Sequence, residues 1–458
     1  MTGCRRARRC SGSPDAEVDD LMRDDQSPPP PVVPGLPLLG NALRMMGDVQ
    51  GFLVDTHRRM GPVFRVRALN QAFVIMAGER ANQFLLKQGD EVLTSEEAFG
   101  GLNREFNMRV HVLRDRPHRH LRKQLAAGLS RDLLAARWDD VIAITERTFQ
   151  RWEGVAALPV VDRFQRLAAE QLSIAFTGAS SAARFEQLRW AFELVLDVTI
   201  AGKWPPSVLR WPVYRRARAE ILAFARDSLE QRAKQPVGGP ADLLDKALAA
   251  VDENGRPYPP EVRAGMALQG YFAGINTVAY LYSFMLYALL RHPDVLARVT
   301  AETDGAGPFT FDRLRDMPAL RGLVLETLRM YPPAPGSART ATKAFDFEGY
   351  RIEKGRRVLV ATSVPHHLPE HFPSPERFDI DRDFAAARKA SVYAPFSVGS
   401  HTCLGAGMTE VLAVVTMATL VRSLTATLPR PDQPLKITAT PGPNPGKRFK
   451  VAVNVRRA

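Results

Sequence analysis

Cysteine is scarce in this sequence, and its scarcity excludes several classes of protein. The 458 residues include three cysteines, Cys4, Cys10 and Cys403. With two of them in a polar stretch near the start, they cannot assemble a disulfide framework or a four-ligand zinc site. A reducing compartment fits this usage best, and we expect a cytoplasmic protein.

The N-terminus lacks the apolar segment that a signal peptide or a membrane anchor requires. Basic residues at 5–9 are followed by polar and acidic residues over 11–27, so no hydrophobic continuation is present. We expect residues 1–27 to be a disordered polar and basic tail. Residues 28–458 are expected to form one domain.

Acidic residues are outnumbered by basic ones, and the net charge is +13. A basic balance favours anionic partners, such as nucleic acid, a membrane surface or an acidic protein. Apart from the arginines near the start, the excess is not gathered into one patterned run. We therefore interpret most of it as a solvated Arg-rich surface and expect no nucleic-acid partner.

Long hydrophobic runs are also rare, with one exception. Residues 264–290 are 27 consecutive residues without a charge, which is long enough to span a bilayer. Gln269, Asn276 and Thr277 lie in the middle of the run, and amphipathic sequence flanks it on both sides. We therefore expect a long helix buried at the centre of a large core, and no transmembrane span.

Helical periodicity dominates from about residue 78 to residue 330. Strand patterns lie on either side of this region: a hairpin of 63–68 with 72–76, strands over 344–362, and a pair near 435–439 and 449–455. A last long helix is predicted over about 404–426. The order predicts one α+β domain that is predominantly helical, with a long central helix and small β-sheets.

The segment FSVGSHTCLGAG, residues 396–407, carries the most informative chemistry. Cys403 directly precedes an apolar helix, and the unpaired N–H groups at a helix N-terminus favour a thiolate, which is a metal ligand. Gly399 and Gly405 permit a tight turn and a close approach of a flat macrocycle to the backbone.

The segment alone leaves other interpretations of Cys403 open. A single cysteine beside an apolar helix is usually a small core residue. A cysteine at a helix N-terminus can also be a catalytic nucleophile. A third interpretation is a redox-sensing thiol.

The same segment resembles the haem loop of the cytochrome P450 family, F-x-x-G-x-x-x-C-x-G. Phe396, Gly399, Cys403 and Gly405 match all of its fixed positions, while Ser397 stands where a second glycine is more common. The resemblance implies a haem b cofactor with Cys403 as the sulfur ligand of the iron. It also implies that Phe396 shields the sulfur and that His401 donates a hydrogen bond to a haem propionate.

A second motif is Glu326 with Arg329 in GLVLETLRMYPP, at positions i and i+3 of a predicted helix. By itself such a pair is a common surface ion pair. In the family, this E-x-x-R motif pairs with an arginine of a later P-E-R-F segment, here Pro375–Phe378. The resemblance therefore implies a buried structural network of Glu326, Arg329 and Arg377.

The charge-free helix contains FAGINTVAY, which resembles the family's oxygen-binding segment A-G-x-[D/E]-T at Ala273, Gly274 and Thr277. The resemblance implies that Gly274 leaves room for O₂ and that Thr277 holds water near it. Asn276 replaces the usual acid, and an amide orients water but cannot ferry protons as a carboxyl group does. The alternative for Thr277 is a mid-helix threonine bonded to its own backbone.

Haem carboxylates need cationic partners. His118 and Arg122, four residues apart, resemble the helix that grips a propionate in this family, and Arg339 matches another propionate arginine. The alternative is a solvated basic helix face, above all for Arg119 and Lys123. Those residues could instead form the docking surface of an acidic electron carrier.

Taken together, the resemblance implies a monooxygenase that inserts one oxygen atom of O₂ into an apolar small molecule, terpenoid, steroid, fatty-acid or polyketide-like. Electrons would come from NAD(P)H through a separate acidic ferredoxin-type donor and its reductase. The alternatives are a peroxide-using or isomerising haem-thiolate enzyme, and a non-catalytic haem sensor. Substrate walls are expected from 99–112, 190–211, the central helix and 334–337. Within them, residues 203–216 mix Trp with basic residues, which is typical of a lid or of membrane contact, and we favour the lid.

Overall fold

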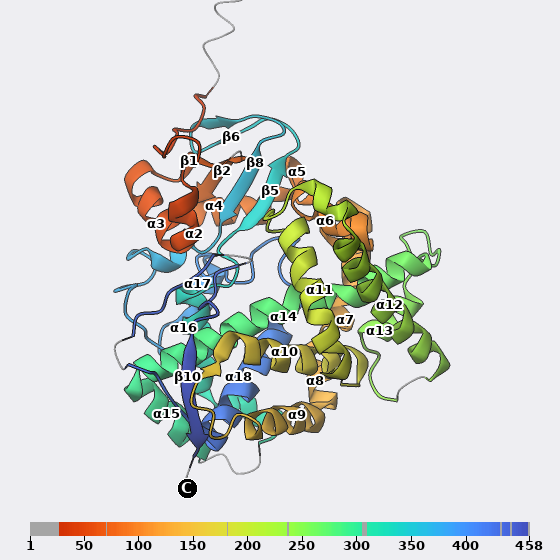
Figure 1. The fold of residues 1–458 in the computed structure, drawn as a ribbon. Helices are drawn as coiled ribbons and strands as arrows, with labels where there is room; N and C mark the ends of the chain where they lie inside the picture. The colour runs from red at the N-terminus through yellow and green to blue at the C-terminus, as the bar shows by residue number, and fades with distance from the viewer. Residues whose placement is uncertain are drawn as a thin grey trace, which may run out of the picture.

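The computed structural model describes residues 27–69, 71–180, 182–235, 238–304, 309–430, 433–439 and 442–456. Helices form most of it, and the strands gather mainly at one end, where the first strands of the chain lie beside strands from its last third (Figure 1). The prediction for the tail at 1–27 lies outside the described residues, except for residue 27.

The predicted central helix is present as α14, Pro260–Arg291. It crosses the middle of the molecule and packs most extensively against α10, Val160–Thr177 (Figure 1). Within the charge-free run, Ala273 and Thr277 are the exposed positions. α14 and α18, Ala406–Ser423, are long and apolar enough to cross a membrane, but most of each is buried inside the protein. Helices that are apolar on all sides are what the core of a large domain requires.

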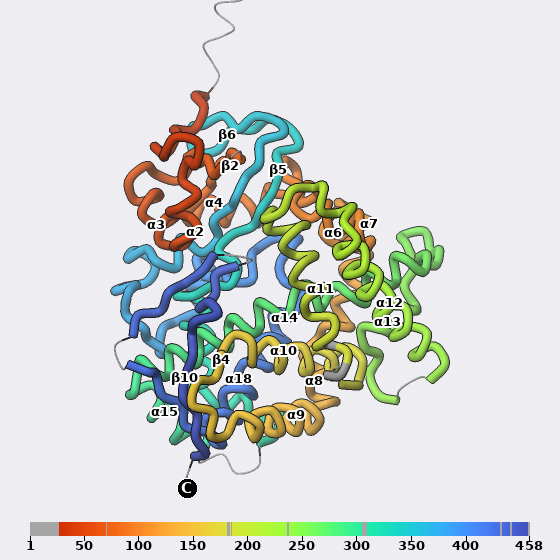
Figure 2. The backbone as a smooth tube through the Cα atoms, in the orientation of Figure 1, coloured from red at the N-terminus to blue at the C-terminus, as the bar shows by residue number. Residues whose placement is uncertain are grey.

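The other helices surround this core, and Figure 2 follows the chain through them. They are α2 Ala42–Gly47, α3 Val49–Met60, α4 Glu79–Lys87, α5 Gly89–Val92, α6 Glu96–Phe106, α7 Asp115–Ala127, α8 Arg131–Ala136, α9 Trp138–Gln150, α11 Ala182–Thr199, α12 Pro212–Lys234, α13 Leu243–Ala249, α15 Pro293–Asp304, α16 Pro318–Met330 and α17 Phe384–Lys389. Short 3₁₀ turns add η1 Arg109–His111, η2 Pro206–Arg210, η3 Asp312–Asp316 and η4 Val364–His367.

The largest sheet joins strands from the first hundred residues to strands from residues 337–361. Its order is β1-β2-β8-β5-β3, with β1 Val63–Ala68, β2 Gln71–Ala77, β8 Arg357–Ala361, β5 Ser337–Ala341 and β3 Leu93–Thr94. The predicted hairpin is confirmed, since β1 pairs antiparallel with β2 from Val63 opposite Met76. The strands predicted over 344–362 are also present, as β6 Phe345–Phe347, β7 Tyr350–Ile352 and β8. Because β8 is flanked by β2 and β5, it ties the N-terminal hairpin to the second half of the chain.

The predicted strand pair near the C-terminus is wrong in part. β10, Lys450–Val455, pairs with β9, Leu424–Thr427, and with β4, Leu158–Pro159, and does not pair with residues 435–439. The latter contribute an isolated bridge of Thr438 to Asn444. α18 also ends at Ser423, three residues before the predicted boundary, because the Thr-rich residues that follow take the extended conformation that β-branched side chains favour.

Candidate active site

The loop that carries Cys403 is a tight turn placed just before α18. The Cys403 N–H donates to the Phe396 carbonyl at 3.0 Å, which closes the loop. Gly399 has φ +81°, in the left-handed region that glycine favours, and a Cβ there would lie 3.0 Å from the Leu85 carbonyl oxygen. Gly405 has an ordinary φ of −88° as the residue before α18. The turn therefore requires glycine at 399 but not at 405.

Ser397 holds the position where the haem loop more often has a second glycine. Its φ is +63°, so this serine adopts the left-handed conformation that glycine takes without strain. Its hydroxyl lies 2.7 Å from the hydroxyl of Ser337 at the start of β5. The departure from the motif thus keeps the backbone conformation and adds a bond between the loop and the sheet.

Cys403 is accessible, which is not the state of a packed core cysteine. Burial among surrounding protein nevertheless raises the pKa of its thiol, while the Gly405 N–H and the Arg122 guanidinium act in the opposite direction. The predicted preference for a thiolate at the helix N-terminus is therefore outweighed within the protein alone. A coordinated metal cation deprotonates a thiol directly, so ligation supplies what the helix does not.

Cationic side chains gather around the same loop. Arg122 of α7 donates a hydrogen bond to the Thr402 carbonyl, next to Cys403. The ring of His118, one turn earlier on α7, stacks on the ring of His401, with 4.2 Å between the ring centroids. Arg339 of β5 is 7% exposed, and burial lowers the pKa of its guanidinium to about 10. Three elements distant in sequence thus bring the four residues that were predicted to hold propionates to one region.

Among the described residues, the arginines of this cluster, Arg122 and Arg339, form no ion pair, although the carboxylate of Asp90 acts on Arg339 and His118 from a distance. Arg339 donates to the carbonyl of its neighbour Ala338 at 2.8 Å. The buried Nε2 atom of His118 has no hydrogen-bond partner among the described residues. Buried guanidinium groups are costly without a counter-ion. An accessible sulfur beside a buried and a half-buried arginine without ion pairs fits a haem, whose iron would take the thiolate and whose two carboxylates would need cationic partners.

His111 is a member of the cluster that sequence reasoning did not single out. It ends η1 and stacks on Phe99 at 4.5 Å. Burial lowers the pKa of its imidazole to about 4, and the charges of Arg122, Arg339 and His118 act in the same direction. No local motif includes His111, and packing of the folded chain alone brings it to the cluster, so the sequence could not indicate its place there.

The central helix presents two different faces near the predicted oxygen-binding segment. Ala273 and Thr277, one turn apart, are exposed, and the Thr277 hydroxyl donates to the Ala273 carbonyl at 2.8 Å. This is the backbone bond of a mid-helix threonine. Gly274 lies toward α10 instead, since a Cβ there would lie 2.8 Å from a methyl group of Leu172. In this structure, the glycine lets the two core helices approach each other.

Asn276 lies away from the face of Ala273 and Thr277. Its side-chain oxygen accepts a hydrogen bond from the Gln165 amide of α10 at 2.8 Å. Both amides line a cavity of about 600 Å³ whose wall also includes Asp162 and Arg189, which form an ion pair at 2.6 Å. Adjacent residues of a helix point about 100° apart around its axis, so Asn276 and Thr277 face different sides of α14. Asn276 faces this polar cavity, which lies between α10, α11 and the loop of residues 438–447. Gln165, its partner, was not foreseen.

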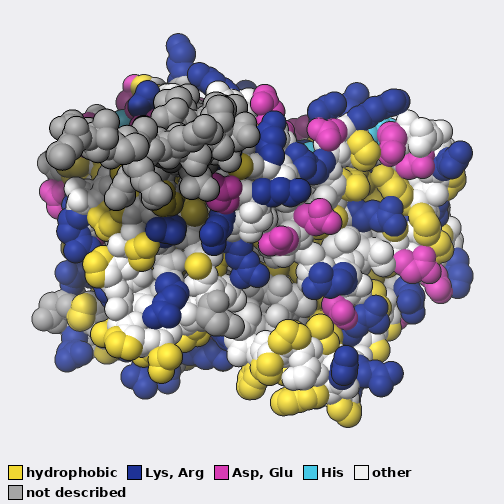
Figure 3. Space-filling model, turned by 90° about the horizontal axis from the view of Figure 1, so that it is seen from above, with side chains coloured by type: hydrophobic (Ala, Val, Ile, Leu, Met, Phe, Trp, Pro, Cys, Tyr) yellow, Lys and Arg dark blue, Asp and Glu magenta, His cyan; other side chains and the backbone are white. Residues whose placement is uncertain are grey.

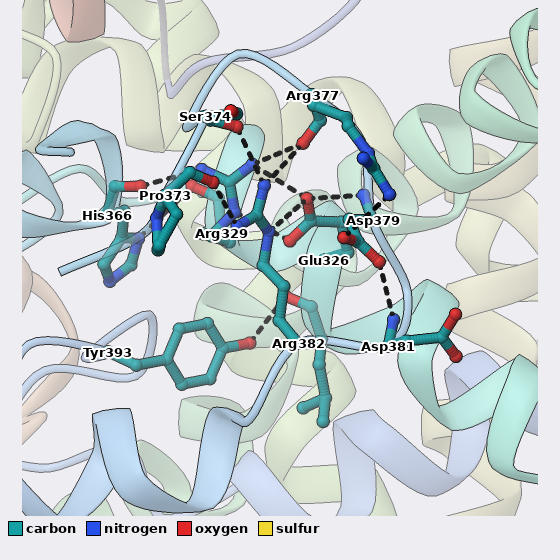
Figure 4. A network of polar contacts seen from close by, with 11 residues as sticks. Glu326, Arg329, His366, Pro373, Ser374, Arg377, Asp379, Asp381, Arg382 and Tyr393 are labelled. Carbon is teal, nitrogen blue, oxygen red and sulfur yellow. Dashed lines mark hydrogen bonds and ion pairs between the residues drawn. The ribbon is translucent and has the colours of Figure 1, made fainter.

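The predicted buried network exists, but one of its members was wrong. Glu326 and Arg329 are both fully buried. The Arg329 guanidinium donates two hydrogen bonds to the Glu326 carboxylate, from Nε to Oε2 at 2.7 Å and from Nη2 to Oε1 at 2.8 Å. Arg382 completes the network by donating to Glu326 at 3.2 Å. The side chain of Arg377 is 72% exposed and pairs with Asp379, pointing away from Arg329 (Figure 4).

A turn in the backbone explains the exchange. The N–H of Arg377 donates to the Ser374 carbonyl, and the next side chain, Phe378, is buried against His292. Arg377 therefore points outward and contributes its carbonyl, which accepts from Arg382 at 2.9 Å. No spacing rule in the sequence indicates that an arginine five residues later returns to Glu326.

Every member of the network has hydrogen-bond partners. Arg329 donates to the His366 carbonyl at 2.7 Å, and Glu326 accepts from the backbone N–H of Asp379 at 2.8 Å (Figure 4). Arg382 also donates to the carbonyls of Pro373 and Ser374. Buried charges are tolerated when each donor and acceptor is satisfied. The network thus fastens α16 to the irregular segment that leads to the Cys403 loop.

Comparison with known proteins gives a consistent picture. The family model described as Cytochrome P450 matches residues 28–452. The chain is 24% identical to a sterol 14alpha-demethylase of Mycolicibacterium vanbaalenii, over 84% of this chain and 88% of the relative. It is 28% identical to a cyclooctat-9-en-7-ol 5-monooxygenase of Streptomyces melanosporofaciens, over 85% of this chain and 86% of the relative. The solved structure of retinoic acid bound cyanobacterial CYP120A1 covers 94% of this chain and is itself covered completely, with TM-score 0.82 and 25% identity.

These matches confirm the resemblance, the predominantly helical single-domain fold and the assignment as an enzyme. The match runs through the Cys403 loop, the buried ion network and the central helix. The chain belongs to the cytochrome P450 family, whose members are haem-thiolate monooxygenases.

Proposed function

We propose that this protein inserts one oxygen atom of O₂ into an apolar small molecule at a haem b whose iron is bound by Cys403. The observation that carries the proposal is the accessible Cys403 sulfur beside the buried Arg339 and the half-buried Arg122, neither of which forms an ion pair among the described residues. When bound, the haem supplies the activation of O₂, and the thiolate donates electron density that favours O–O cleavage.

The side chains around the loop would hold the haem carboxylates. Arg339 and Arg122 would supply the charge, and the buried Nε2 atom of His118, which has no hydrogen-bond partner among the described residues, would supply a donor. His401 is held in place by its stacking on His118. Phe396 would shield the sulfur, since it packs against the main core and its carbonyl already holds the Cys403 N–H.

The substrate would belong to the apolar class represented by terpenoids and steroids, with fatty-acid and polyketide-like molecules as further candidates. Relatives are named for a sterol, for cyclooctat-9-en-7-ol and for retinoic acid, and all three are apolar skeletons with few polar groups. In this chain, Phe99 and Leu196 are partly buried apolar side chains on α6 and α11 that suit such a ligand.

Electrons would come from NAD(P)H through a separate, acidic ferredoxin-type carrier and its reductase in the cytoplasm. The same helix that places Arg122 beside the Cys403 loop exposes Arg116, Arg119 and Lys123 on its outer side. Opposite charges steer association and shorten the search for a productive encounter. An acidic carrier bound there would lie next to the sulfur ligand.

A second candidate function is supported by Asn276. Its amide cannot carry a proton, and its hydrogen bond to Gln165 holds it away from Thr277. Hydrogen peroxide already carries the two electrons and two protons that O₂ would have to receive at the site. A site without a proton-carrying acid therefore suits an enzyme that uses peroxide. Thr277 would orient water in either case.

Isotope labelling distinguishes these functions. Purified protein is incubated under ¹⁸O₂ with a panel of terpenoid and steroid substrates, a surrogate ferredoxin, its reductase and NADPH. The masses of the products are then measured by mass spectrometry. One ¹⁸O atom in each product molecule is the expected result. Product that forms with hydrogen peroxide alone favours the second candidate, and a protein that binds ligands but turns over none of them would be a sensor.

A further inference from the structure

The polar cavity beside Asn276 is large enough to hold an organic molecule. Its volume of about 600 Å³ falls within the range of about 300–1,000 Å³ that is usual for small-molecule sites. It lies between α10, α11 and the loop of residues 438–447, on a different side of α14 from Thr277. A ligand in this cavity would therefore be held by residues other than those assigned to the haem.

Two amide side chains in the wall of the cavity have unused hydrogen-bonding groups. Gln165 of α10 donates to the side-chain oxygen of Asn276 at 2.8 Å. Among the described residues, this contact leaves the N–H groups of Asn276 and the carbonyl oxygen of Gln165 without a hydrogen-bond partner. The pair therefore offers the cavity a donor and an acceptor side by side.

A third polar group of the wall is the hydroxyl of Tyr280, one turn after Asn276 on α14. Tyr280 is 4% exposed, and its hydroxyl forms no hydrogen bond with the described residues. Burial raises the pKa of the phenol, and the charges of Glu193 and Asp197, which both line the cavity, act in the same direction. The hydroxyl therefore keeps its proton. A buried polar group is normally hydrogen-bonded, so Tyr280 needs a partner from within the cavity.

The charges of the cavity wall balance. Three acidic and three basic side chains line it. Asp162 lies 2.6 Å from Arg189, and Asp197 lies 2.6 Å from Lys203. The outer surface differs, since Lys and Arg side chains predominate on the face seen in Figure 3. A charged ligand would lose its water in the cavity and meet mostly charges that are already paired, so the wall favours a neutral polar ligand.

We propose that the polar cavity binds a neutral polyhydroxylated group, that is, a sugar or a sugar-like ring. Every hydroxyl of such a ring both donates and accepts, which matches an amide N–H, a carbonyl oxygen and a phenol that lie together. Val161 and Leu196 add apolar surface to the wall, which suits the C–H faces of the ring. The ring could be a free sugar or the glycosyl end of a larger molecule, and both present the same chemistry. The proposal does not depend on the reaction at Cys403, so each can fail without the other.

The test is a ligand-observed NMR titration of the full-length haem protein with maltose and with methyl β-glucoside. Saturable binding of both is expected. Tyr280→Phe removes only the hydroxyl, and it should weaken the binding about tenfold, as the loss of one hydrogen bond to a buried group does. The matched control is Tyr287→Phe, the same substitution on the same helix, at a residue that is 9% exposed and lies outside the cavity wall. It should bind as the unaltered chain does.

A second titration separates the two sources of the sugar, and it rests on the proposed function. A steroid glucoside and the same steroid without its glucose are each added while the absorption spectrum of the haem is recorded. If the cavity holds the glycosyl end of a substrate, Tyr280→Phe lowers the affinity of the glucoside about tenfold and leaves that of the free steroid unchanged. If the cavity takes free sugars, only the NMR titration responds to Tyr280→Phe. Sugar binding without any response to either steroid counts against the proposed substrate class and supports the cavity as a sugar site.

Three results would overturn the proposal. The first is no binding of any sugar or glucoside by protein with an intact haem spectrum, which leaves the cavity to water. The second is an affinity that Tyr280→Phe does not change, or that Tyr287→Phe reduces equally, which places the sugar elsewhere. The third is an affinity for glucose 6-phosphate about tenfold or more above that of the neutral sugars and lost in Lys447→Glu, an exposed member of the wall. That result would assign the cavity to an anion.

Discussion

The hydroxyl of Ser397 lies 2.7 Å from the hydroxyl of Ser337, and this contact joins the Cys403 loop to strand β5. Ser337 stands two residues before Arg339 on that strand. The bond therefore connects the segment that presents the sulfur with the strand that carries a buried cation of the same site. Because Ser397 also has a positive φ, its hydrogen bond offsets a conformation that a glycine would adopt without strain.

Replacing Ser397 separates these two effects. Ser397→Ala keeps the strained backbone and loses the hydrogen bond, so the free energy of unfolding should fall by about 1–2 kcal/mol. Ser397→Gly loses the bond but also relieves the strain, so its unfolding free energy should change by less than about 1 kcal/mol. Urea denaturation of the haem protein measures both, with Ser337→Ala as the control for the bond alone. Equal losses in the alanine and glycine variants would contradict the strain at this position.

The exchange of Arg377 for Arg382 in the buried network predicts opposite outcomes for two arginines. Arg382→Ala leaves the Glu326 carboxylate without one of its buried partners, and the free energy of unfolding should fall by about 3–5 kcal/mol or the protein should fail to fold. Arg377→Ala removes an exposed side chain, and its effect should stay below about 1 kcal/mol.

Urea denaturation and haem content of the two purified variants test this pair, and each serves as the control for the other. Arg382→Lys adds a check on geometry, because lysine keeps the charge but cannot reproduce the fork of hydrogen bonds. The network as described here is refuted if Arg377→Ala proves as damaging as Arg382→Ala.

Stability should depend on pH through His366. Burial lowers the pKa of this imidazole well below its usual value. Its Nε2 atom accepts from the Ala394 N–H at 2.9 Å, which requires the neutral ring. His367 behaves alike, with a pKa lowered to about 3, again chiefly by burial.

Since the unfolded chain binds these protons near pH 6.5 and the folded chain does not, the stabilisation is complete above that pH and is lost as the pH falls. Between pH 6.5 and 5.5 each histidine should remove about 1 kcal/mol from the free energy of unfolding. Urea midpoints at a series of pH values measure the slope. His366→Gln, which cannot titrate, should lower the overall stability but flatten the slope, and an unchanged slope in that variant would argue against the neutral ring.

Asn276→Asp should supply the acid that the helix lacks. A carboxyl group at this position can carry protons, and it would lie beside the polar cavity and the Gln165 amide. We expect turnover with ferredoxin and reductase to rise by on the order of tenfold relative to turnover with peroxide, less than the hundredfold or more of a fully positioned acid, because the new carboxyl group would face the polar cavity.

The pH profile of that variant supplies a second readout, because a new ionisation should appear in the turnover driven by ferredoxin. The matched control is Asn276→Ala, which removes the amide without adding an acid and should produce neither change. A ratio of the two activities that does not move in the aspartate variant would show that residue 276 does not serve proton transfer.

The features that the sequence predicted well depend on local patterns. The charge-free run, the β1–β2 hairpin and the position of Cys403 before a helix each lie within a single short segment. Periodicity and turn residues determine such elements, and the cytochrome P450 motifs add their order along the chain.

The features that it missed depend on contacts between distant segments. Arg382 reaches Glu326 across 56 positions, and Gln165 reaches Asn276 across 111. His111 joins the cations beside Cys403 through packing alone. A side chain's direction in an irregular segment follows from turns such as the one at Ser374, which no periodicity encodes.

The central claim is that Cys403 binds the haem iron as a thiolate, and the absorption spectrum of the reduced protein under carbon monoxide tests it most directly. The unaltered protein should show the red-shifted Soret band characteristic of thiolate ligation, and Cys403→Ser should lose that band while the fold persists by circular dichroism. A protein purified without haem, or a Cys403→Ser variant that keeps the thiolate spectrum, would contradict the assignment of the sulfur ligand.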